Sequence, residues 1–183
     1  MKIKEIKNLE ESLYKFDEDG RCIIDVVVND EDSILSSFSG NDPTISNEFS
    51  EYIENKTTIK HIKNQLTINI ICDTIDEKEE VLYREAIKNN YILKYLESRK
   101  EMIRDFIIAG AMLLVGILVL ILAVILELNG KNNIILEIYD IIAWVFVWEA
   151  TDIVFFKRTI TNLKRKKYYC LMNAKVNYKK KTQ

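Results

Sequence analysis

The sequence predicts an α+β cytoplasmic domain, a small sheet with helices, on a two-helix transmembrane hairpin. Three observations of the 183-residue chain lead to this fold class. An uncharged apolar run extends from Phe106 to Leu126, and a second apolar segment, Ile134 to Phe156, follows almost at once. The segments outside these two runs show the alternation of strands and the spacing of amphipathic helices.

The run from Phe106 to Leu126 matches the thickness of a bilayer. Its 21 residues contain no charge, Pro, Asn or Gln. A helix rises about 1.5 Å per residue, so the run spans roughly 30 Å of hydrocarbon. Because the run follows a long charged segment, we interpret it as a permanent anchor and not as a cleavable signal peptide.

The second apolar segment predicts an antiparallel partner for the first. The connection from Glu127 to Asn133 is short and polar, which is typical of a tight turn between helices. Cations flank both segments on the side away from this turn, which holds only Lys131. The positive-inside rule then places both termini in the cytoplasm and the turn outside. Heavy use of Ile, Lys and Asn favours a bacterial gene, so we expect a multi-pass protein of the bacterial inner membrane.

Acidic residues inside the second apolar segment are the nearest approach to a functional signal. At about 100° per residue, Glu137, Asp140 and Asp152 share one broad side with Trp144 and Trp148, with Glu149 at its edge. The simpler interpretation is that these residues are interfacial acids and form interhelical hydrogen bonds that fix the packing of the helices. The alternative is a proton or cation path through an oligomer. The intramembrane polar candidates are Asp140, Glu149 and Asp152.

Small residues recur every seven positions along the first apolar run. Ala109, Gly116 and Ala123 lie on one narrow stripe, where a second helix can approach closely. These three residues are our helix-packing candidates. The pattern leaves open whether the approaching helix belongs to the same chain or to another copy.

The amino-terminal part predicts two strands separated by a helix. Arg21 to Val28 is rich in β-branched residues, and Leu66 to Cys72 alternates like a half-buried strand. Between them, Ile45, Phe49, Tyr52 and Ile53 mark one helix face, so the strands are expected to be parallel neighbours. The acidic turn Asp17 to Gly20 favours a β-hairpin with the preceding residues, whereas the spacing of Ile3, Ile6, Leu9 and Leu13 equally fits a short amphipathic helix.

A long helix is expected to lead into the membrane. Thr74 and Glu77 have the spacing of a capping box, and no Pro or Gly interrupts Ile75 to Ala109. A continuous helix would transmit movement of the head to the bilayer, but a break near Lys88 to Asn90 is the alternative.

The carboxyl-terminal segment predicts a basic helix and a strand. The helix extends from about Lys157 to Leu171, with Ile160, Leu163 and Leu171 as its apolar positions. Ala174 to Tyr178 then alternates like a strand that could add an edge to the head's sheet. Residues 157–183 hold ten Lys or Arg and no acid, whereas residues 1–100 have a balance of −7. Attraction to the acidic head or to anionic lipid would keep this tail near the membrane.

Sites for catalysis or cofactors are not evident in the sequence. The single histidine, His61, has no nucleophile beside it and is expected on the surface. The cysteines Cys22, Cys72 and Cys170 lack the spacing of a metal site or a disulfide framework, so we expect buried thiols. Asp25 with Asp30 to Asp32 lacks the spacing of a calcium loop. We therefore expect no enzyme activity, no cofactor, no metal and no nucleic-acid partner.

The expected organisation has six segments. They are a head over 1–75, a long helix over 76–105, a transmembrane helix over 106–127, an external turn over 128–133, a second transmembrane helix over 134–156, and a basic helix and strand over 157–183 that can pack on the head.

These patterns favour a non-enzymatic integral membrane protein. Its head would bind a protein or small regulator, and its hairpin would serve as an anchor and an oligomerisation surface. The alternatives are a small oligomeric ion channel or membrane effector gated by the head, and an accessory subunit of a membrane complex. The expected partners are the bilayer, with anionic lipid at the basic tail, further copies of the chain, and a protein whose identity the sequence leaves open.

Overall fold

The chain forms two compact units in a computed structural model. The structure describes residues 14–29, 33–40, 43–73, 75–130 and 133–180. One unit, which we call the head, comprises Met1–Tyr95 and Lys166–Gln183, and the other, which we call the helix pair, is Leu96–Arg165.

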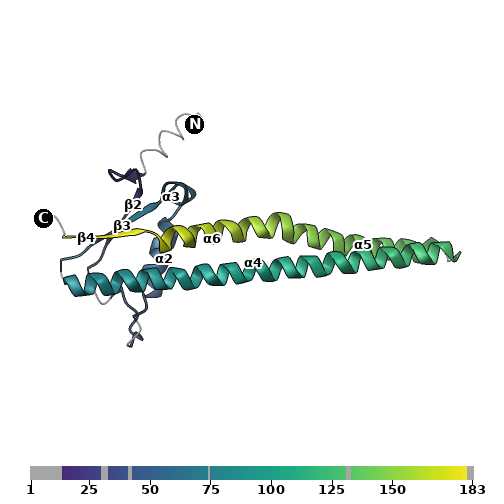
Figure 1. Ribbon diagram of the computed structural model, residues 1–183, viewed down its shortest axis with the longest axis horizontal. Coiled ribbons are helices and arrows are strands. Elements are labelled where there is room, and N and C mark those ends of the chain that lie inside the picture. Colours follow the sequence, from purple (N-terminus) through teal and green to yellow (C-terminus); the bar gives the residue numbers. More distant parts are fainter. Residues whose placement is uncertain (1–13, 30–32, 41–42, 74, 131–132, 181–183) are drawn as a thin grey trace. The chain divides into compact units, whose positions relative to one another are not determined.

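The head is built on a four-stranded mixed sheet in the order β1-β2-β3-β4 (Figure 1). β1 (Lys15–Phe16) and β2 (Cys22–Val27) form an antiparallel hairpin, which confirms that prediction, and Gly20 supplies a left-handed φ of 76° at its turn. β3 (Leu66–Ile71) lies parallel to β2, also as expected. The predicted strand at the carboxyl terminus is confirmed as well, because β4 (Lys175–Lys179) lies parallel to β3. The mixed sheet thus uses both ends of the described chain.

Helices from three parts of the chain cover one face of this sheet. α2 (Asn47–Lys56) and α3 (Ile59–Asn64) connect β2 to β3, and only α2 was expected. The core also takes residues from α4 (Glu77–Leu128) and from the end of α6 (Arg158–Met172). Tyr52 was expected on the buried face of α2 but is 43% exposed, whereas Phe49 and Ile53 are buried. The largest buried side chains include Tyr91, Ile34, Ile53, Ile68, Ile87 and Leu171.

Strand β3 is buried on both faces, so the prediction of a half-buried strand is wrong. Thr67 and Asn69, on the face opposite the helices, are almost fully buried. Their polar atoms are satisfied locally. Thr67 donates a hydrogen bond to Asp17 (2.7 Å), and the Asn69 amide donates to Asp25 (2.9 Å). Hydrogen bonding makes a buried polar residue compatible with a central strand, and alternation alone does not reveal it.

Helix α4 is continuous over 52 residues, so the alternative of a break near Lys88 to Asn90 is wrong. The helix begins at Glu77, later than the expected box at Thr74, which lies outside the described residues. The observed cap uses Asp76 and Glu79: the Asp76 N–H donates to the Glu79 carboxylate (2.9 Å), and the Glu77 N–H donates to Asp76 (2.7 Å). An acidic residue at this end also interacts favourably with the helix dipole.

The helix pair contains the second part of α4 and the helices that follow it. α5 (Asn133–Asp152) continues through a π-helical turn, η2 (Ile153–Lys157), into α6. Gly116 of α4 packs against α5 at Ala143 to Val147, and Asp105 pairs with Lys157 (3.0 Å). The sequence positions rise on one helix as they fall on the other, so the two run antiparallel, side by side (Figure 1). By length and composition, α4 is the one described helix that is long and apolar enough to cross a membrane.

The π-helical turn changes which residues of α6 are buried. An extra residue per turn rotates the following helix relative to the heptad pattern set before it. Thr161 is therefore buried, whereas Ile160 is 70% exposed and Leu163 is exposed as well. Of the three apolar positions expected for this helix, only Leu171 is buried. Thr159 and Thr161 donate to the carbonyls of Phe155 and Lys157, which satisfies backbone acceptors around the turn.

Candidate functional site

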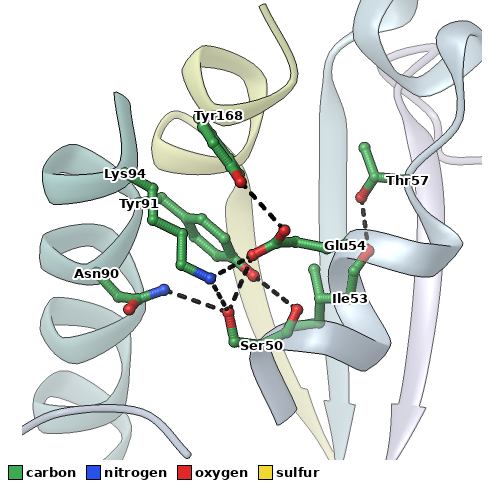
Figure 2. Close-up of polar contacts among 8 residues, drawn as sticks. All are labelled: Ser50, Ile53, Glu54, Thr57, Asn90, Tyr91, Lys94 and Tyr168. Atoms are coloured by element: carbon green, nitrogen blue, oxygen red, sulfur yellow. Dashed lines mark hydrogen bonds and ion pairs between the residues drawn. The ribbon is translucent and has the colours of Figure 1, made fainter. Parts of the chain in front are cut away.

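A polar cluster joins three helices of the head (Figure 2). Glu54 of α2 forms an ion pair with Lys94 of α4, and Lys94 also donates to the Ser50 hydroxyl (2.8 Å). The Asn90 amide donates to the same hydroxyl (3.4 Å). The hydroxyl of Tyr168 on α6 donates to the second oxygen of Glu54 (3.4 Å). One carboxylate on α2 thus holds side chains from both neighbouring helices.

Burial shifts the pKa values of Tyr91 and Lys167 beside this cluster. The Tyr91 hydroxyl donates to the Ser50 carbonyl (3.4 Å), and burial raises the pKa of Tyr91 well above its usual value, so the phenol keeps its proton. Burial lowers the pKa of Lys167, against the attraction of Glu54. Glu54 is already engaged by Lys94 and Tyr168, so the arrangement suits the positioning of α2 better than proton transfer.

His61 is buried, so the prediction of a surface histidine is wrong. Its side chain caps α3, where Nδ1 accepts the Thr58 N–H (3.1 Å), and its ring contacts Tyr14 edge to face at 5.2 Å between centroids. Burial lowers the pKa of His61. A neutral ring is required here because a protonated Nδ1 cannot accept the cap hydrogen bond. The histidine therefore has a structural explanation that its polar sequence neighbours conceal.

The cysteines are buried and unbridged, as expected. The Cys170 thiol donates to the His61 carbonyl (3.4 Å), and burial raises the pKa of Cys170 to about 11. A thiol with so high a pKa is a poor nucleophile. The prediction of a buried cysteine is confirmed at this position.

Asp25 belongs to an ion pair on the sheet and not to a metal site in the described residues. Hydrogen bonds from Lys15 (2.8 Å) and Asn69 lower the pKa of Asp25. The acidic residues 30–32 that were weighed with it lie outside the described residues. Within the described part of the chain, no group of three His, Cys, Asp or Glu residues is placed to hold a metal ion.

The three acidic candidates of the second apolar segment point away from α4. Asp140, Glu149 and Asp152 are all exposed on the helix pair, together with Trp144 and Trp148. Since Gly116 lies level with residues 143–147, Glu149 lies level with about residue 113 of α4. That position is about 10 Å inside the apolar run. The structure therefore places Glu149 deepest of the three, on an outward face.

The three packing candidates lie on the face of α4 that meets α5. Ala109, Gly116 and Ala123 are all buried, and so are Ala143 and Ala150 of α5, which repeat at the same seven-residue interval. A Cβ atom built on Gly116 would lie 3.1 Å from Val147 and 3.3 Å from the Cβ of Phe146. Small residues on both helices thus allow a close approach within one chain.

An ion pair and an apolar groove lie at one end of the helix pair. Asp105 is 6% exposed and pairs with Lys157, with Arg104 at 3.9 Å. Beside it is a cavity of about 190 Å³ that Phe106, Ile153 and Val154 line, with Arg158 and Thr161. A second cavity of about 210 Å³ shares Phe106 and Val154 with the first and continues past Gly110. The two cavities adjoin at these shared residues, and together we call them the α4–α5 groove.

Sequence reasoning missed both the Glu54 cluster and the α4–α5 groove. The acids and bases of the cluster are separated by 40 or more residues, so no local spacing brings them together. The groove depends on η2, whose π-helical turn has no simple sequence signal. The ion pair of Asp105 could have been predicted from the sequence. Asp105 stands directly before an uncharged run, where a charged side chain is expected to have a partner.

Comparison with known proteins finds no matching family model, no matching curated protein and no matching solved structure.

Proposed function

We propose that the protein is a non-enzymatic integral membrane protein whose head binds a protein or small regulator and whose helices form a membrane-crossing hairpin. The observation that carries this proposal is the surface of the helix pair. Large apolar side chains are exposed around the outside of both α4 and α5, for example Ile107, Leu118, Ile141 and Val145. Each such side chain gains roughly 1 kcal/mol when lipid replaces water.

Packing between the helices favours two crossings over one. α5 is held against α4 at Gly116, in the middle of the apolar run. If that run lies in hydrocarbon, α5 lies at the same depth. A carboxylate costs roughly 3 kcal/mol at the centre of a bilayer and less toward its edges. Of the four acids in the second apolar segment, Glu149 lies furthest from both ends, and the exposed Ile, Val and Trp side chains of α5 offset the cost. Cations before the run and after α5 then favour a head in the cytoplasm, with both termini on the cytoplasmic side of a bacterial inner membrane.

The head offers one feature suited to a partner. Phe38 is 96% exposed, and its N–H donates to the Ser36 hydroxyl (3.3 Å). The neighbouring Ser39 hydroxyl donates to the Thr44 carbonyl (3.0 Å) and accepts the Thr44 N–H (3.1 Å). Apolar aromatic side chains on ordered loops are common anchors in protein interfaces. Phe38→Ser should weaken capture of a protein partner in cross-linking from intact cells, whereas Tyr52→Ser, a matched change on α2, should not.

Extraction tests the membrane part of the proposal directly. The full chain should remain with vesicles at alkaline carbonate and should float with them in a density gradient. Release into the soluble fraction would contradict the proposal. Robust turnover of any substrate by the protein would contradict its non-enzymatic part.

A channel is the second candidate because the acids of α5 face outward. In an oligomer, Glu149 and Asp152 of each copy could line a shared path. Ion flux in liposomes that Glu149→Gln or Asp152→Asn abolishes would support the channel. A strictly monomeric protein in detergent would oppose it, because two helices cannot enclose a path.

A further inference from the structure

The α4–α5 groove combines an apolar floor with a cationic end. Its walls are Phe106, Leu113, Val154 and Phe155, and Gly110 leaves open space where another residue would place a side chain. Each of its two cavities exceeds the roughly 150 Å³ of an engineered apolar cavity that binds benzene. A groove of this kind, facing outward from helices in a bilayer, has the dimensions and polarity to hold part of an acyl chain.

Charge at the end of the groove favours an anion. Arg158 lines it, and among the described residues no acidic side chain is within ion-pair distance of Arg158. Asp105 also lines it, but Lys157 and Arg104 offset its charge. Of the two charged side chains that line the groove, Asp105 is therefore neutralised by its own cations, and Arg158 is left to bind an anion. An arginine beside an apolar groove matches a phosphate attached to a hydrocarbon chain, because a guanidinium binds phosphate oxygens in a planar fork.

We propose that the α4–α5 groove binds one anionic phospholipid per chain, with an acyl chain along Phe106 and Gly110 and the phosphate on Arg158. The proposal rests on the membrane insertion proposed above and assigns a lipid class to one surface of the helices. The π-helical turn η2 contributes Ile153 and Val154 to the groove and brings Arg158 to its rim. Basic pockets between transmembrane helices on the cytoplasmic side are typical sites for anionic headgroups.

Titration of the delipidated full chain tests this site. Native mass spectrometry in mild detergent would compare phosphatidylglycerol with phosphatidylcholine of the same acyl chains. We expect one phosphatidylglycerol per chain, bound at least about tenfold more tightly than phosphatidylcholine. Equal binding of the two lipids would overturn the proposal. Displacement of the lipid by millimolar glycerol phosphate would also overturn it, because the occupant would then be a soluble phosphate.

Matched variants separate the groove from general charge and general packing. Arg158→Gln should reduce phosphatidylglycerol binding about tenfold, and Arg158→Lys should restore only part of it, because an ammonium keeps the charge but lacks the planar fork. Gly110→Leu should fill the groove and reduce binding of both lipids. The controls are Arg99→Gln, an exposed cation elsewhere on α4, and Ala111→Leu, an exposed position outside the groove. If Arg99→Gln lowers binding as much as Arg158→Gln does, diffuse charge explains the result and the site is wrong.

Carbonate extraction of the same preparations distinguishes the two levels of the proposal. A chain that resists extraction but binds no phosphatidylglycerol would refute the groove and leave the membrane anchor intact. A chain that washes off the membrane would refute the anchor, and the lipid site would be refuted with it.

Discussion

The head and the helix pair bury opposite kinds of side chain. In the head, large side chains such as Ile68, Ile53 and Tyr91 are fully buried. In the helix pair, the most buried apolar positions are the small residues Ala109 and Ala143, while most of the Leu and Ile side chains are exposed and Ile153 is a buried exception. The arrangement of the head is stable in water, because it removes large apolar surfaces from the solvent. The arrangement of the helix pair gains nothing in water but suits lipid, where close backbone approach provides the packing.

Ile68→Ala should have the largest effect, because it opens a cavity at the centre of the sheet. Ile68 is fully buried between β2 and β4. We expect a loss of about 2–5 kcal/mol in the opening free energy of the head, measured by hydrogen exchange of β3 amides in the full chain in nanodiscs. Leu118→Ala, at an exposed position of the helix pair, should change it by less than about 0.5 kcal/mol. Similar losses from the two variants would remove the contrast.

Gly116→Val adds a side chain in the helix pair, whereas Ile68→Ala removes one from the head. The added side chain would meet Val147 and Phe146 within 3.3 Å and would force α4 from α5. The expected cost is about 1–3 kcal/mol, seen as a lower temperature for loss of the monodisperse peak in detergent. Gly110→Val is the control in delipidated protein, where the proposed lipid is absent, since a Cβ atom at Gly110 has no neighbour within 4 Å. An equal loss in both variants would contradict the packing account, because helix propensity favours Val over Gly at both positions.

The Glu54–Lys94 pair should contribute about 1 kcal/mol to the stability of the head. Both side chains are partly exposed, so solvent screens the attraction. A double-mutant cycle with Glu54→Gln and Lys94→Met measures the coupling free energy from hydrogen exchange. Strictly additive effects would mean that the cluster of Figure 2 does not position α2.

His61 should give the head a small dependence on pH. Burial lowers its folded pKa below the value near 6.5 of an unfolded histidine. The unfolded chain therefore binds more protons than the head as pH falls below about 6.5, and stability that is complete above that pH is lost as pH falls through the folded pKa. His61→Asn, which keeps an acceptor for the Thr58 N–H, should flatten the profile between pH 7 and 5. An unchanged slope in this variant would contradict the assignment.

Patterns within a short stretch of sequence predicted the strands, α2 and the uninterrupted α4 well. Val176 alternates with its neighbours as an edge strand requires, and hydrophobic periodicity is a local property. What failed depends on distant partners. His61 is buried because Tyr14 and α6 cover it. Ile160 is exposed because η2, which precedes α6, rotates that helix. The seven-residue spacing of Ala109, Gly116 and Ala123 indicated a packing face, but only the structure places that face against α5.

Thiol labelling tests the central claim, that the helix pair crosses the membrane twice and leaves the head and both termini inside. Single cysteines would replace Asn129 at the turn, Phe38 on the head and Lys180 near the carboxyl terminus, and the three native cysteines are buried. With a membrane-impermeant maleimide on intact cells, the account predicts labelling at position 129 only, with 38 and 180 labelled after permeabilisation. Labelling of 38 or 180 in intact cells, or protection of 129, would contradict it.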